Sequence, residues 1–166
     1  AVYKDGKPII DLYGGFQDRD KKICWNKDTL VNVHSTSKGI VAMVVAKLID
    51  NGDLELDKRV CDYWPEFSEN GKNDIKVKTL LSHQAGLYGW RDPLDETDFY
   101  KWDYVCELLA KQKPFHEPNE EICYHPKTIG FLSNNIKFTK VINFVEWLLE
   151  IYLSQLPYLL LSFKMC

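Results

Sequence analysis

The stretch VNVHSTSKGIVAMVVAKLIDNG, residues 31–52, predicts an extended segment that turns into a helix. Leu30 to Val33 are rich in apolar and β-branched residues, which predicts a short strand. Apolar side chains then recur at helical spacing until Asn51-Gly52, a pair that ends helices. Ser35 therefore lies at or just before the first turn of the predicted helix.

Ser35 precedes Lys38 by three residues, so the two side chains share one face of that helix. A serine hydroxyl is a weak nucleophile until a neighbouring group takes its proton, and a lysine amine is one such group. The free N–H groups at a helix N-terminus also favour the oxyanion that forms when an acyl carbon is attacked. The pattern therefore indicates an activated serine. Taken alone, it also fits an N-capping serine followed by an exposed lysine.

Three segments, taken in order, resemble one protein family. They are VNVHSTSKGIVAMVVAKLIDNGDLELDKRVCDYWPEF from Val31, IKVKTLLSHQAGL from Ile75 and YHPKTIGFL from Tyr124. Their order and spacing are similar to the serine beta-lactamase-related family, which includes penicillin-binding proteins, class C beta-lactamases and serine esterases. The HQAGL and YH forms look closer to the esterase-like branch. The resemblance implies an α+β, partial beta-lactamase/transpeptidase-like fold with an N-terminal β-hairpin and a helical region.

The resemblance also implies a role for each matching residue. Ser35 would be the acylated nucleophile, Lys38 its proton partner and Tyr124 the general base and acid. A tyrosine becomes a usable base when cations lie against its oxygen, because they lower its pKa from about 10. His125 would be a substrate-binding residue that lines the pocket, or would have a structural or solvent-facing role. Pro126 departs from the family pattern, in which many members carry an asparagine that esterase-like members often lack.

Other interpretations of these segments stay open. Tyr124 also fits a half-buried aromatic side chain near a loop. His83 lies where the family has a helix end followed by a turn at Ala85-Gly86, so we expect it to hold backbone rather than to move protons. The sequence positions no acidic residue to complete a serine–histidine triad. The histidines and cysteines lack metal-ligand spacing, so we predict no metal and no cofactor.

The rest of the chain reads as a mixture of short strands and helices. Asp5-Gly6 is a favoured tight-turn pair and predicts a β-hairpin over residues 2–13. Apolar periodicity predicts helices over residues 75–82 and 102–111. Prolines in residues 113–121 predict a loop that delivers the tyrosine of the third segment.

The resemblance runs to about Leu132, so we predict an incomplete beta-lactamase-related domain over residues 1–132. Residues 133–166 would form a divergent apolar helical tail. The C-terminal sheet strands, with the third family motif and its oxyanion N–H, are expected to be missing. Two classes of function follow. One is a serine hydrolase that acts on an ester or amide through an acyl-enzyme, and the other is an inactive truncated relative with a binding role or none.

Composition and charge limit the classes of binding partner that we expect for this chain. The chain has 166 residues, of which 45% are hydrophobic, enough for one compact core. Its net charge of -3, without a basic patch, argues against a nucleic-acid partner and favours a small-molecule substrate. Charged and polar residues interrupt the tail, so we predict no membrane span, although its apolar surface allows self-association. Five cysteines without paired motifs, and no signal peptide, predict a cytoplasmic location.

Overall fold

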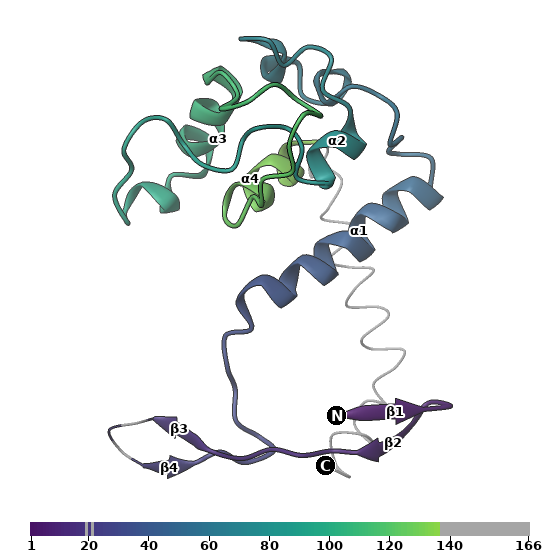
Figure 1. Ribbon diagram of the computed structural model, residues 1–166, viewed down its shortest axis with the longest axis vertical. Helices are drawn as coiled ribbons and strands as arrows, with labels where there is room; N and C mark the ends of the chain where they lie inside the picture. Colours follow the sequence, from purple (N-terminus) through teal and green to yellow (C-terminus); the bar gives the residue numbers. More distant parts are fainter. Residues whose placement is uncertain (19, 21, 137–166) are drawn as a thin grey trace. The chain divides into compact units, whose positions relative to one another are not determined.

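The computed structural model describes residues 1–18, 20 and 22–136. The described residues form two compact units, residues 1–34 and 35–136, and each is treated by itself. The first holds two small antiparallel sheets and the second is helical (Figure 1). This mixture of helices and small sheets confirms the predicted α+β class.

The first unit begins with the predicted hairpin. β1 (Val2–Lys4) pairs antiparallel with β2 (Lys7–Ile10). Asp5 and Gly6 connect them with φ angles of 51° and 73°, the left-handed geometry that a two-residue hairpin turn needs. The second strand ends at Ile10, three residues before the predicted limit.

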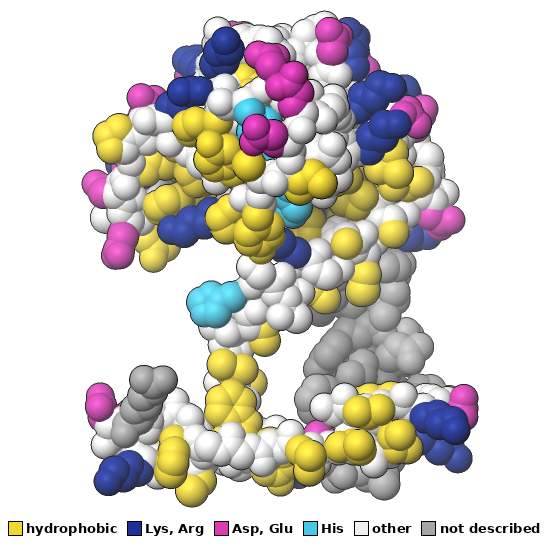
Figure 2. Space-filling view, viewed as in Figure 1, with side chains coloured by type: hydrophobic (Ala, Val, Ile, Leu, Met, Phe, Trp, Pro, Cys, Tyr) yellow, Lys and Arg dark blue, Asp and Glu magenta, His cyan; other side chains and the backbone are white. Residues whose placement is uncertain are grey.

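A second antiparallel hairpin follows, formed by β3 (Phe16–Asp18) and β4 (Ile23–Cys24). The strand predicted over Leu30 to Val33 is wrong, because these residues adopt no regular structure. The Asn32 side chain instead accepts the His34 N–H at 2.9 Å, a local turn that competes with strand pairing. Apolar side chains along this unit are exposed (Figure 2).

The second unit opens with the predicted helix. A 3-10 turn, η1 (His34–Ser37), leads into α1 (Lys38–Asp50). Asn51 caps this helix, and Gly52 follows at φ 75°, as the Asn-Gly pair predicts.

Most of the remaining helices of this unit, drawn in Figure 1, contribute buried residues to its core. They are η2 (Val60–Asp62), η3 (Pro65–Ser68), α2 (Val77–Leu81), η4 (Asp98–Tyr100), α3 (Trp102–Lys111) and α4 (Thr128–Asn135). α3 has the predicted bounds, and the predicted loop over 113–121 contains no helix or strand. α2 begins two residues later than predicted, because Lys76 is extended and bridges to Arg59, and the Ile75 carbonyl accepts the Val60 N–H at 2.8 Å.

α4 crosses the domain boundary that the sequence predicted at 132/133. Ser133 is buried, and the buried Ile136 packs in the same core cluster as Leu132. The first four residues of the predicted tail therefore belong to this unit, and residues 137–166 lie outside the described residues. No helix within the described part of the chain is long and apolar enough to cross a membrane.

Candidate active site

Ser35 Oγ lies between the two side chains that the sequence assigned to it. The Tyr124 hydroxyl donates a hydrogen bond to this oxygen at 2.8 Å, and the Lys38 ammonium donates another at 3.2 Å. η1 holds Ser35 one turn before Lys38, the first residue of α1, so their separation of three residues becomes a direct contact. The structure thus brings together all three predicted catalytic residues.

Lys38 has a second anchor that the sequence did not reveal. Its ammonium donates to the carbonyl oxygen of Pro126 at 2.8 Å and lies 5.1 Å from the centre of the Tyr124 ring. The sequence identified Pro126 only as a departure from the asparagine that many relatives carry. A backbone carbonyl does not depend on the side chain, so proline supplies this acceptor as well as any residue.

Tyr124 is held through its two neighbours in the chain. The Cys123 N–H donates to the carbonyl of His83 at 3.0 Å, and the His125 N–H donates to Nδ1 of His83 at 3.2 Å. His83 therefore holds backbone, as its place in the second segment suggested. Its ring also packs edge-on against the Tyr124 ring, with 5.0 Å between the ring centres.

The turn that presents His83 requires a glycine at its far end. Gly86 has φ 68°, a conformation that residues with a Cβ rarely adopt. A Cβ atom at Gly86 would lie 2.6 Å from the carbonyl oxygen of His116. The close approach of these two backbones packs the loop that ends at Tyr124 against the turn.

His125 is fully buried and both of its ring nitrogens are occupied. Nε2 accepts the Leu87 N–H at 3.1 Å, so Nδ1 carries the proton and donates it to the carbonyl of Cys123 at 2.5 Å. Burial lowers the pKa of His125 to about 4, so the ring is neutral. This burial supports the structural alternative for His125, and a role in substrate binding stays a prediction.

Two neighbouring side chains lower the pKa of Tyr124. The hydrogen bond with Ser35 lowers the pKa of Tyr124, and contact with the positively charged Lys38 lowers it further. The same cation, added to the larger effect of burial, lowers the pKa of His83 and so favours a neutral ring there. Ser35 and Tyr124 are exposed, so a substrate can reach the oxygen between them.

Comparisons with known proteins identify the family of this chain. The family model "Beta-lactamase" matches residues 1–134. The chain is 35% identical to the esterase/beta-lactamase LipL of Mycobacterium tuberculosis over 82% of its own length. It is 25% identical to Protein flp of Staphylococcus aureus over 98% of its length, an alignment that continues past Leu132.

The chain is also similar to solved structures of beta-lactamase-related proteins. A family VIII carboxylesterase has 45% sequence identity and a TM-score of 0.69 over 74% of this chain. A penicillin-binding protein homologue from Caulobacter crescentus has 41% identity, with the same TM-score and coverage. The chain spans about a third of the length of these relatives, 31% of LipL and 33% of each solved chain. The chain belongs to the beta-lactamase family.

Proposed function

We propose that this chain carries the nucleophile, the lysine and the tyrosine of a serine hydrolase that cleaves a small ester or amide through an acyl-enzyme. The observation that supports this most strongly is the contact of one oxygen, Ser35 Oγ, with both Tyr124 and Lys38. An N-capping serine would need neither partner. The N-cap residue of α1 is Ser37, which makes no side-chain capping bond, so Ser35 is not the N-capping serine of this helix.

In the first step, ionised Tyr124 takes the proton of the Ser35 hydroxyl along the 2.8 Å hydrogen bond. Ser35 Oγ attacks the carbonyl carbon of the substrate and forms a tetrahedral oxyanion. The Tyr124 hydroxyl then gives its proton to the leaving alkoxide or amine, and the acyl group stays on Ser35. Water hydrolyses this ester by the same steps in reverse order, with Tyr124 again as base.

Lys38 makes this chemistry feasible at lower pH. A phenolate beside an ammonium is stabilised relative to a neutral phenol, so the Lys38 charge increases the fraction of Tyr124 that is ionised. The Pro126 carbonyl holds the ammonium close to Ser35 through its 2.8 Å hydrogen bond. The positive charge of Lys38 therefore favours the ionised form of Tyr124, and Tyr124 is the group that transfers the proton.

Among substrates, we favour an ester over a lactam. The relatives named as esterases include a carboxylesterase that is 45% identical in sequence to this chain. The Pro126 side chain, where many relatives have an asparagine, also lacks the amide that would contact a substrate. The expected cytoplasmic location and self-association stay predictions.

The direct test is formation of an acyl-enzyme with p-nitrophenyl butyrate. The purified chain, shown to be folded by circular dichroism, is mixed with the ester, quenched and mapped by mass spectrometry. We expect a butyryl group on the peptide that contains Ser35. Ser35→Ala should remove the adduct and lower p-nitrophenol release by at least about 10³-fold, because the nucleophile is lost.

Ser37→Ala is the matched control, because Ser37 lies in the same 3-10 turn but its hydroxyl is not a hydrogen-bond partner of the Tyr124 or Lys38 side chain. It should keep both the adduct and most of the rate. A folded chain that forms no adduct on Ser35 would overturn the hydrolase proposal and favour the inactive relative. An adduct that persists in Ser35→Ala would show that another residue reacts.

A further inference from the structure

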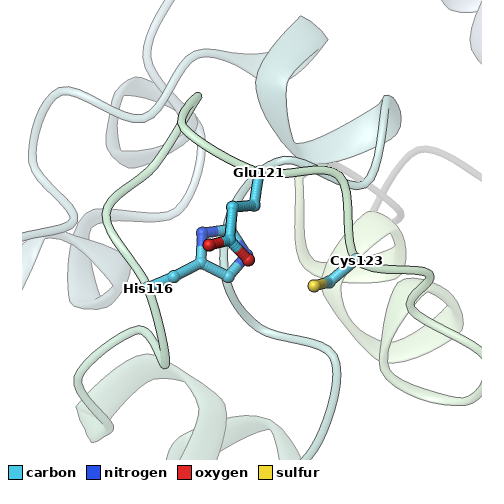
Figure 3. Close-up of side chains that lie close together, drawn as sticks. All are labelled: His116, Glu121 and Cys123. Atoms are coloured by element: carbon cyan, nitrogen blue, oxygen red, sulfur yellow. The ribbon is translucent and has the colours of Figure 1, made fainter.

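The loop that delivers Tyr124 brings together three side chains that bind metals in other proteins. His116, Glu121 and Cys123 each offer one ligand atom, and these atoms lie within 4.8 Å of one another (Figure 3). Figure 3 shows the imidazole, the carboxylate and the thiol lying close together, from three points along the same loop. The spacing along the chain fits none of the familiar zinc patterns, which is why the sequence predicted no metal.

The hydrogen bonding of the His116 ring leaves one of its nitrogens available to bind a metal ion. Its Nδ1 lies 2.9 Å from the carbonyl oxygen of Glu117, and a carbonyl can only accept, so Nδ1 carries the proton. Nε2 then presents a lone pair. That atom is buried and has no hydrogen-bond partner among the described residues. A buried nitrogen lone pair that accepts no hydrogen bond is costly, and a bound ligand would satisfy it. Metal-binding histidines are commonly oriented by a hydrogen bond from the other ring nitrogen to a carbonyl, as Nδ1 makes here.

The backbone holds the loop in place for binding. The Cys123 N–H donates to the His83 carbonyl at 3.0 Å, and the Phe115 N–H donates to the Gly86 carbonyl at 2.8 Å. The Asn119 N–H donates to the Gln84 carbonyl at 3.0 Å. Both ends and the middle of the loop are thus anchored to one turn. Ligand atoms on a tetrahedral zinc ion lie roughly 3.3–3.8 Å apart, given bonds of about 2.0–2.3 Å. The three ligand atoms lie within 4.8 Å of one another, so binding requires them to move closer together.

We propose that His116, Glu121 and Cys123 bind a zinc-like divalent transition-metal ion. A thiolate and an imidazole select zinc over magnesium or calcium, which prefer oxygen ligands. Two negative ligands balance the charge of the ion, and the thiol proton of Cys123 passes to solvent when the sulfur binds. Three protein ligands leave a fourth position for water or an external group. Because Cys123 directly precedes Tyr124, the bound ion would also brace the loop that carries the proposed base.

Cobalt(II) is the probe for this site, because a bound thiolate gives it a charge-transfer absorption that free cobalt lacks. The purified, reduced chain is titrated with Co²⁺, and Zn²⁺ is then added. We expect one equivalent of Co²⁺ to produce the band and Zn²⁺ to displace it. Cys123→Ser should abolish the band, and His116→Ala should weaken Co²⁺ binding by at least about tenfold.

Two further variants separate the site from general effects on folding. Glu121 is exposed, so Glu121→Gln should keep the fold, as judged by circular dichroism, and still weaken binding by about tenfold or more. Cys24→Ser removes an exposed thiol elsewhere and should leave the titration unchanged. The proposal is overturned if no thiolate band appears, or if the band survives Cys123→Ser or is lost in Cys24→Ser. None of these measurements uses hydrolysis, so the result is independent of the proposed function.

Discussion

Residues 1–34 expose most of their large apolar side chains, whereas residues 35–136 bury many of theirs in a core. In the first unit, Phe16 is 57% exposed and Ile9 is 59% exposed, whereas in the second Phe67 and Leu109 are fully buried. Within the described residues no second layer covers the faces of the two-stranded hairpins, but the helices of the second unit cover one another. Ser35, Lys38 and Tyr124 all lie in the unit that has its own core.

The comparison indicates which substitutions the chain tolerates. A site held at hydrogen-bond distances needs rigid support, and in this chain that support comes from the buried contacts of residues 35–136. Substitutions that disturb this core or the turn at residues 83–87 should cost far more than matched substitutions in the hairpins.

The largest difference should appear between two phenylalanines. Phe67 is fully buried and packs on Trp64 with 5.4 Å between ring centres, so Phe67→Ala should lower the free energy of unfolding by about 3–5 kcal/mol. Phe16→Ala removes an exposed ring and should change it by about 0.5 kcal/mol or less. Urea unfolding followed by tryptophan fluorescence measures both. Equal losses would break the proposed contrast between the two units.

A second comparison uses glycines with the same backbone conformation. Gly86 and Gly52 both have positive φ, but a Cβ atom at Gly52 would meet nothing within 4 Å. Gly52→Ala should cost about 1–2 kcal/mol from backbone strain alone. Gly86→Ala adds the clash with His116 and should cost about 2–5 kcal/mol. Thermal unfolding of the two variants decides the point, and a Gly52→Ala variant that loses as much would refute the close approach.

A smaller effect should follow from the buried His125. Its pKa is about 4 in the folded chain and about 6.5 when unfolded, so between these values the unfolded chain binds more protons. Stability should therefore fall as pH falls from 7 to 5, and His125 should contribute about 1–2 kcal/mol of that loss. Urea unfolding at both pH values, compared with His125→Asn, isolates this contribution. The same pH dependence in the variant would contradict it.

Much of the site could be predicted because its signals are local. The three-residue spacing of Ser35 and Lys38 needs only one helical turn to become a contact, and Tyr124 followed from a resemblance that carried the third segment. The Pro126 carbonyl and the burial of His125 depend on the path of the backbone, which no side-chain pattern reports. The cluster of His116, Glu121 and Cys123 was missed for the same reason, because a loop rather than a regular element brings its members together.

The fold likewise divides into elements that local sequence patterns predict and elements that depend on contacts with other parts of the chain. α3 was predicted with its correct bounds, because Val105, Cys106 and Leu109 recur on one buried face. The strand expected over Leu30 to Val33 failed, because a strand also needs a neighbour to pair with, and β-propensity alone provides none. Leu30 is 97% exposed, so burial of its side chain does not stabilise a strand here in place of pairing.

The most direct test of the central claim is the pH dependence of Ser35 labelling by a fluorophosphonate probe. If Tyr124 is the base, the labelling rate should rise with pH as Tyr124 ionises, with a midpoint below the ordinary tyrosine pKa of about 10, because Ser35 and Lys38 lower it. Tyr124→Phe should remove this rise and slow labelling by about 10²–10⁴-fold. Tyr88→Phe, which alters a tyrosine stacked on Phe115 instead, should leave the profile intact. An unchanged profile in Tyr124→Phe would contradict the account.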